Sequence, residues 1–129
     1  MQKTFVRGTW QQNRAFSPAV VTAGSAKTIY VAGHTGQIAE DGRELAGDFD
    51  AQCRQTFRNI EKTLAEAGAT LADLVTMTVF LIDARYTTRM TEIRTEIFGK
   101  DFPASAAITV SGFALPSIMI EVQGIAVVA

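Results

Sequence analysis

The sequence predicts an α+β fold in which two helices cover one face of a β-sheet. Two segments, residues 49–67 and 86–98, repeat apolar residues at helical spacing. Short segments rich in β-branched residues flank them, in the order strand, strand, helix, strand, helix, strand, strand. No linker, internal repeat or low-complexity tract interrupts the 129 residues, so we expect a single domain over residues 1–129.

Two short strands are expected near the N-terminus. Residues 19–23 (AVVTA) and 28–33 (TIYVAG) flank the turn sequence GSAK, and this arrangement predicts a hairpin. The pair Asp41-Gly42 marks a second turn, and residues 43–46 are compatible with a further short strand.

The first helix has a start signal and a stop signal. Asp48 is a favourable N-cap and Gly68 is a favourable residue just after the helix end. The apolar stripe between them consists of Phe49, Cys53, Phe57, Ile60, Leu64 and Ala67. Charged residues occupy the other side, so we expect the stripe to pack on a sheet. A capping box over residues 70–73 leads into the next strand.

Residues 74–82 (LVTMTVFLI) form the most apolar strand, and neither of its faces carries a charge. We therefore expect both faces to be covered. The second helix follows, with Asp83 as its cap and Gly99 as its stop. Its apolar stripe consists of Tyr86, Met90, Ile93 and Ile97.

Residues 104–110 and 117–128 complete the predicted sheet, and Gly124 predicts a bulge or a close backbone approach in the last strand. Two helices cover only one face of this sheet. The other face keeps apolar residues without an obvious partner, namely Met77 or Phe80, Ile118 or Met119, and Val122. Large apolar patches are rare on monomers, so we infer that other copies of the chain bury this face.

Composition excludes several classes of function. Twelve Lys+Arg against thirteen Asp+Glu give a net charge of −1, which lacks the basic field of a nucleic-acid binder. The single cysteine, Cys53, and the single histidine, His34, exclude internal disulfides and a Cys- or multi-His metal site. No secretory signal and no apolar run near the roughly 20 residues of a membrane span are present, so we expect a cytoplasmic protein.

Few side chains offer catalytic chemistry. Glu121 lies in an otherwise apolar strand, where a buried carboxyl suits proton transfer. The usual alternation of half-exposed strands favours the plainer interpretation that it faces solvent. His34 follows a strand, where functional residues gather, although a lone histidine is more often structural. Cys53 is expected in the core, and Trp10 is expected to anchor the N-terminal arm by packing.

Three stretches resemble the Rid (YjgF) family. Residues 30–37 (YVAGHTGQ) resemble its strand-and-loop motif, and residues 102–122 (FPASAAITV, then LP, then IMIEV) resemble its C-terminal signature. The first helix, residues 52–69, also fits, and the resemblance covers nearly the whole chain after the first dozen residues. It implies a chorismate-mutase-like fold with a mixed, mainly antiparallel sheet. It also implies homotrimers whose sheets close into a barrel, with small ligands bound in the clefts between subunits.

The resemblance implies an activity as well. Well-known members hydrolyse reactive enamines and imines, such as 2-aminoacrylate, to a keto acid and ammonia, without a metal or an organic cofactor. The resemblance therefore implies a cofactor-independent hydrolase or deaminase that acts on C=N or enamine bonds. Its partners would be a small-molecule metabolite and further copies of the chain, with neither nucleic acid nor membrane.

The polar lining of the family cleft is largely changed in this sequence. Ser105 replaces the arginine that pairs with the substrate carboxylate, so a neutral donor replaces a charged bidentate one. The other differences are Ala19, Ala32, Ala107 and Thr91, whereas Gly33 and Glu121 are retained. We expect a roomier and less polar cleft with Ser105, Glu121 and His34 as its polar groups. A larger, flatter or less acidic ligand than 2-aminoacrylate fits this description.

The leading hypothesis is a homotrimer that hydrolyses a small enamine, imine or related carbonyl metabolite. Glu121 would position or deprotonate the attacking water, backbone N–H groups near Ser105 and Gly33 would hold the substrate, and His34 would be a second acid or base. The alternative is a trimer that binds a metabolite or modulates a partner without turnover.

A third hypothesis is RNA cleavage, an activity that the family resemblance also implies because it has been ascribed to some members. The acidic balance and the absence of a Lys/Arg stripe disfavour it. The nearest basic patch consists of Arg85, Arg89 and Arg94 in the second helix. We expect these three arginines to lie on a solvated helix face.

Overall fold

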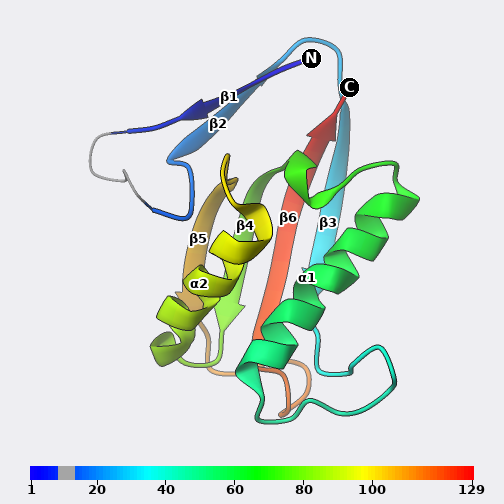
Figure 1. Cartoon of the computed structure of the whole chain (residues 1–129), viewed down its shortest axis with the longest axis vertical. Coiled ribbons are helices and arrows are strands. Elements are labelled where there is room, and N and C mark those ends of the chain that lie inside the picture. The colour runs from blue at the N-terminus through cyan, green and yellow to red at the C-terminus, as the bar shows by residue number, and fades with distance from the viewer. Residues whose placement is uncertain (9–13) are drawn as a thin grey trace.

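The main sheet of the molecule has four strands in the order β3-β6-β4-β5 (Figure 1). The computed structural model describes residues 1–8 and 14–129, and Trp10 lies outside the described residues. The strands are β3 (Lys27–His34), β4 (Leu74–Leu81), β5 (Ala104–Thr109) and β6 (Ile120–Val128). β6 runs antiparallel to β3 and β4, whereas β5 runs parallel to β4. The α+β prediction, with a mixed and mainly antiparallel sheet, is confirmed.

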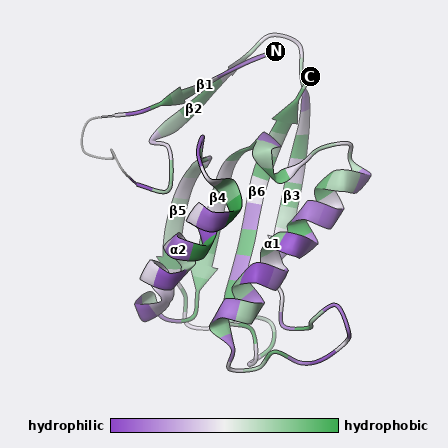
Figure 2. Ribbon diagram, viewed as in Figure 1, coloured by the Kyte–Doolittle hydropathy of each residue, from purple (hydrophilic) through white to green (hydrophobic). Residues whose placement is uncertain are grey.

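Helices α1 (Phe49–Glu66) and α2 (Thr87–Phe98) lie over the same face of this sheet (Figure 1). Both carry hydrophilic residues on the side away from the sheet (Figure 2). The Asp48 carboxylate accepts a hydrogen bond from the Ala51 N–H at 3.1 Å, and Gly68 has φ +80°, so the predicted cap and stop of α1 are confirmed. In the described part of the chain, no helix is long and apolar enough to cross a membrane.

The second helix begins as the sequence predicts. Asp83 accepts a hydrogen bond from the Arg85 N–H and starts a short 3₁₀ turn (Ala84–Tyr86) that runs into α2. Gly99, with φ +72°, follows its last residue. Tyr86 stacks on Phe49 of α1, with ring centroids 4.4 Å apart, and this contact joins the two helices over the sheet.

The N-terminal strands form a separate sheet of two strands. β1 (Gln2–Val6) pairs antiparallel with β2 (Ala19–Ala23), so the predicted hairpin between residues 19–23 and 28–33 is wrong. β1 was not predicted as a strand, and it offers β2 a partner of matching length. β3 pairs instead with the nine-residue β6, which offers it more buried apolar contact. The short strand considered at residues 43–46 is reduced to one bridge between Ile38 and Glu44.

The two faces of the main sheet differ in burial. On β4, Met77, Val79 and Leu81 point to the helices, and each is at most 1% exposed. The register places Val122 beside Val79 on this side, and Glu121 beside Phe80 on the open face. Val122 is therefore buried within the chain, and the prediction that it lacks a partner is wrong. Of the two alternative pairs, Met77 and Ile118 are buried, whereas Phe80 and Met119 are half-buried.

The open face keeps other apolar residues. Phe80 and Ile125 are half-buried, and Tyr30 is 79% exposed. Both faces of β4 were predicted to be covered. Within one chain, the helices cover one face, and the open face is only partly buried. Ile108, on the neighbouring strand β5, is 45% exposed on the open face.

Gly124 marks a close contact between strands. A Cβ atom added there would lie 2.6 Å from the Thr76 carbonyl oxygen, which no other residue type tolerates without a shift. The register of β6 against β4 slips between Leu74 and Thr76, next to this glycine. The predicted close approach is confirmed, and the irregularity lies in the partner strand.

Candidate functional site

Glu121 lies on the open face of the sheet, against Gly33. β3 is irregular between Val31 and His34, where it passes the part of β6 that carries Glu121. A Cβ atom at position 33 would overlap the carboxylate oxygen Oε2 of Glu121, so a glycine is needed for this carboxylate to lie where it does. Glu121 is half-buried. Its exposure therefore lies between the buried and the solvent-facing position, which the sequence left open as alternatives.

His34 points away from Glu121, toward α1. Its register partner is Val122, whose side chain is on the helix side of the sheet. Its Nδ1 lies 2.7 Å from the Ala32 carbonyl oxygen, and its Nε2 lies 2.7 Å from the Thr63 hydroxyl oxygen. Because both ring nitrogens have partners within the chain, the structure favours a structural role for His34.

Ser105 and Ala107 lie on the helix side of the sheet. β5 runs parallel to β4 and places Ser105 beside Met77 and Ala107 beside Val79. With Thr91 of α2 they line a cavity of about 350 Å³ between α2, β5 and the segment before β2. The apolar part of its wall includes Phe16, Met90 and Ala107, and its polar part includes Arg14, Arg94, Ser105 and three threonines of α2.

Arg94, which also lines this cavity, is buried. It is 4% exposed, so the expectation of a solvated position on the helix is wrong. Its Nη1 donates a hydrogen bond to the Ser105 hydroxyl oxygen at 2.8 Å, whereas its Nε is buried without a partner among the described residues. Burial lowers the pKa of Arg94 to about 10, so the guanidinium is still charged at neutral pH.

A sequence signal for the burial of Arg94 did exist. It lies four residues after Met90 and next to Ile93, and both of these are fully buried. Residues four apart share one face of a helix, so Arg94 belongs to the edge of the apolar stripe. Arg85 and Arg89 behave as expected, since they form surface ion pairs with Asp83 and Asp50.

Two half-sites thus lie on opposite faces of the sheet. The helix-side half-site consists of the predicted residues Thr91, Ser105 and Ala107 together with Arg94, which was not predicted as a site residue. The open-face half-site consists of Gly33 and Glu121. The ring of His34 lies apart from both half-sites, at Thr63 of α1. Ala32 is exposed next to Gly33, and Ala19 is exposed at the start of β2, beside Val6. One chain therefore does not bring Glu121 and Ser105 together.

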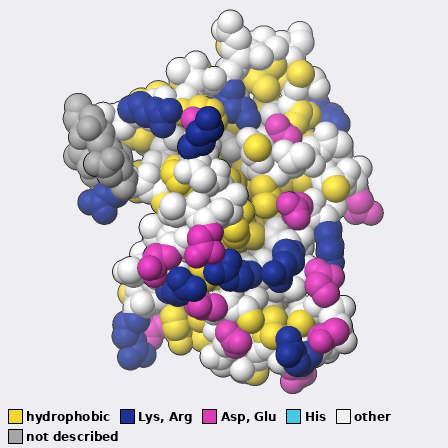
Figure 3. All heavy atoms as spheres, viewed as in Figure 1, with side chains coloured by type: hydrophobic (Ala, Val, Ile, Leu, Met, Phe, Trp, Pro, Cys, Tyr) yellow, Lys and Arg dark blue, Asp and Glu magenta, His cyan; other side chains and the backbone are white. Residues whose placement is uncertain are grey.

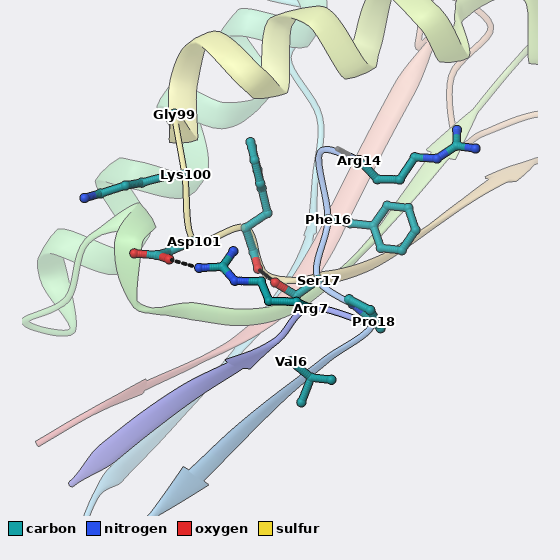
Figure 4. A pocket seen from close by; sticks show the side chains of 10 residues that line it. Val6, Arg7, Arg14, Phe16, Ser17, Pro18, Gly99, Lys100 and Asp101 are labelled. Carbon is teal, nitrogen blue, oxygen red and sulfur yellow. Dashed lines mark hydrogen bonds and ion pairs between the residues drawn. The ribbon is translucent and has the colours of Figure 1, made fainter. Parts of the chain in front are cut away.

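A second cavity of about 460 Å³ adjoins the first (Figure 4). Arg14 and Phe16 line both cavities. Two of its charged side chains pair with each other, because Arg7 forms an ion pair with Asp101 at 3.3 Å. The Ser17 hydroxyl donates a hydrogen bond to the Phe102 carbonyl oxygen at 2.5 Å. This bond joins the segment before β2 to the segment before β5 in the cavity wall.

The charged surface of the helix side is mixed. Lys and Arg side chains alternate with Asp and Glu there and form no single basic area (Figure 3). Arg54 pairs with Glu96 at 2.9 Å, and Arg89 pairs with Asp50 at 2.8 Å. Within the described residues, no group of three or more His, Cys, Asp and Glu side chains is placed to hold a metal ion.

Comparison with known families decides the assignment of this chain. Residues 10–128 match the model of the family described as endoribonuclease L-PSP. The chain belongs to this family. It is the Rid (YjgF) family that the motifs of the sequence resemble.

Named relatives of this Rid-family chain agree with the match. A RutC family protein of Pyrococcus abyssi is 39% identical over 99 residues, which make up 76% of each chain. The human 2-iminobutanoate/2-iminopropanoate deaminase is 31% identical over 102 residues, which make up 78% of this chain and 73% of the human one.

Solved structures show the same fold. A Rid-family protein from Yersinia pestis, described as being of unknown function, matches with a TM-score of 0.80 and 26% identity over 98% of both chains. A YjgF-family protein from Mycobacterium tuberculosis matches with a TM-score of 0.69 and 30% identity, over 98% of this chain and 100% of that one.

Proposed function

We propose that three copies of this chain form a homotrimer that hydrolyses a small enamine or imine in clefts between the copies. The observation that carries the proposal is the division of the site residues into two half-sites on opposite faces of the sheet. A cleft that needs both half-sites has to take one from each of two neighbouring copies. The relationship to the human deaminase supports the chemistry, and the proposal places the reaction in the cytoplasm.

The open face supports assembly. It presents Tyr30 and Ile108 to solvent and half-buries Phe80 and Ile125, while both helices lie on the other side. An apolar face of this kind on a small protein is typical of an interface. The proposed trimer requires that the copy covering this face places its own β5 and α2 close to Glu121 of its neighbour.

In the proposed reaction, Glu121 moves protons. In the addition step the water oxygen bonds to the imine carbon, while Glu121 accepts a water proton and passes it to the nitrogen. In the elimination step Glu121 moves the hydroxyl proton to the nitrogen, the carbon–nitrogen bond breaks, and ammonia leaves a carbonyl product. An enamine first shifts a proton to carbon and becomes the imine. Backbone N–H groups near Gly33 and the Ser105 hydroxyl hold the substrate.

The cavity favours a substrate larger than 2-aminoacrylate. Ala107 is a small residue in the wall, and Ser105 is much shorter than the arginine that the family resemblance implies at its position. The cavity of about 350 Å³ falls at the lower end of the roughly 300–1,000 Å³ that small-molecule sites occupy.

The test measures ammonia release from imines generated in the assay mixture by an amino acid oxidase, over substrates of increasing side-chain length. The wild-type protein should accelerate release, most strongly above the size of alanine. Glu121→Gln should lower the rate by about 10²–10⁴-fold. Glu61→Gln, which changes an exposed carboxylate on α1, is the matched control and should keep full activity.

Two results would overturn the proposal. A mass near the 13.9 kDa of one chain in sedimentation equilibrium, rather than three times that value, would remove the shared cleft. Saturable binding of keto acids with no acceleration for any imine would instead favour a trimer that binds a metabolite without turnover. The alanines at positions 19, 32 and 107, which replace polar residues of the family, are the observation that keeps this alternative.

A further inference from the structure

Arg94 is a buried cation without a compensating anion. It is 4% exposed, and no described carboxylate forms an ion pair with it. Within residues 1–8 and 14–129, its one hydrogen bond goes to the neutral hydroxyl oxygen of Ser105, and its Nε has no hydrogen-bond partner. Removing a charge from water is costly unless it is paired, so this arrangement is unusual for a residue that only supports the fold.

The cavity beside Arg94 has the chemistry that an anion requires. None of the described residues that line it is acidic, and Arg14 stands exposed at its wall as a second cation. The Ser105 hydroxyl oxygen accepts from Arg94, which leaves its own hydrogen free to donate into the cavity. The neighbouring hydroxyls of Thr91 and Thr95 donate to backbone carbonyls of α2 instead.

We propose that Arg94 supplies the anion-binding group of the helix-side half-site, and that the ligand places a single carboxylate against this guanidinium. This inference rests on the proposed function only in taking the cavity as part of the substrate cleft. It reverses the sequence-based expectation of a less acidic ligand. The guanidinium comes from α2 rather than from β5, and Ser105 serves to orient it.

Steric and electrostatic reasons favour a short, neutral residue at position 105 beside the buried Arg94. The guanidinium reaches the oxygen of Ser105 at 2.8 Å, so a long side chain at position 105 would compete for the same space. A second guanidinium there would also add like charge in a buried region. A short hydroxyl residue at position 105 therefore accompanies a buried arginine at position 94.

The single buried charge selects a monoanion. A carboxylate matches one guanidinium in charge and in planar geometry. The second cation, Arg14, is exposed to water, and the remaining wall formed by Phe16, Met90 and Ala107 is apolar, so the second charge of a phosphate is poorly compensated. We therefore expect a small carboxylate to bind more tightly than inorganic phosphate.

The test is isothermal titration calorimetry with 2-oxobutanoate, its neutral amide and inorganic phosphate. The wild-type protein should bind 2-oxobutanoate at least tenfold more tightly than the amide or phosphate. Arg94→Met should abolish this preference, and Arg85→Met, which removes an exposed arginine beside α2, should keep it. The exchange Arg94→Ser with Ser105→Arg returns a guanidinium to the cavity and should restore part of the affinity.

The outcomes separate this inference from the proposed function. Equal binding of 2-oxobutanoate by wild type and Arg94→Met would overturn the role of Arg94, whatever the turnover. Turnover of a neutral imine with no preference for carboxylates would also overturn it and leave the hydrolysis intact. Carboxylate binding that depends on Arg94, without turnover of any imine, would support this inference and contradict the proposed function.

Discussion

Replacing Arg94 by methionine should stabilise the protein. In the folded chain, burial lowers the pKa of Arg94 by more than two units from its ordinary value, to about 10. At 1.36 kcal/mol per pKa unit, the charged form costs about 3 kcal/mol at neutral pH. The variant also loses the hydrogen bond from Arg94 to Ser105. This loss offsets about 1.5–3 kcal/mol of the gain in unfolding free energy, because the donor is charged. Methionine also fills most of the volume, so we expect a net gain of about 1 kcal/mol.

The pH dependence carries a definite sign. Above pH 10 the folded chain releases the Arg94 proton before the unfolded chain does, so the wild-type free energy of unfolding rises relative to the variant. The advantage of Arg94→Met should therefore be constant between pH 6 and pH 9 and shrink above pH 10. Urea unfolding followed by circular dichroism, at one fixed protein concentration, measures both effects.

A matched control and a clear refutation accompany this experiment. Arg85→Met, at an exposed position, should leave the unfolding midpoint unchanged. If Arg94→Met instead destabilises the protein by about 1 kcal/mol or more, the guanidinium is compensated in the assembly. The anion-binding role would then lose its physical basis.

Three further substitutions probe the half-sites and the core. Gly33→Ala should displace the Glu121 carboxylate and lower turnover about as much as Glu121→Gln, with an unchanged circular dichroism spectrum. His34→Gln should keep turnover within a few-fold of wild type while lowering the thermal midpoint, because its ring bonds to Thr63; a loss of turnover comparable to that of Glu121→Gln would restore His34 as an acid or base. Leu64→Ala, at a fully buried position, should cost about 2–5 kcal/mol in urea unfolding, and a smaller loss would show that the contact of α1 with the sheet is looser than described.

Local signals in the sequence predicted most of the fold. Helix ends depend on residues within one turn, so a short stretch of sequence is enough to predict them. This applies to the caps Asp48 and Asp83 and to the stops Gly68 and Gly99. Strand pairing is not determined locally, because β2 can pair with a strand before it or with a strand after it in the chain. The choice of β1 over β3 depends on the whole sheet.

The candidate site was predicted only in part. Glu121 and Gly33, which the family resemblance marks as retained, lie against each other, and Ser105 lines a cavity with Thr91. The burial of Arg94 was missed because a charged residue beside an apolar stripe is usually solvated. How the two half-sites meet depends on contacts between copies, which no pattern within one chain specifies.

The most direct test of the shared cleft is complementation between two inactive variants. Glu121→Gln lacks the open-face half-site, and Arg94→Met lacks the helix-side half-site, but each keeps the other. After joint refolding of equal amounts, each mixed trimer should have one intact cleft of its three, since each cleft of a ring joins two different surfaces. With the inactive homotrimers included, about one cleft in four of the whole mixture combines two intact half-sites. The account predicts recovery of about a quarter of wild-type ammonia release in the mixture. Mixed trimers of confirmed composition that remain as inactive as the two parents would contradict it.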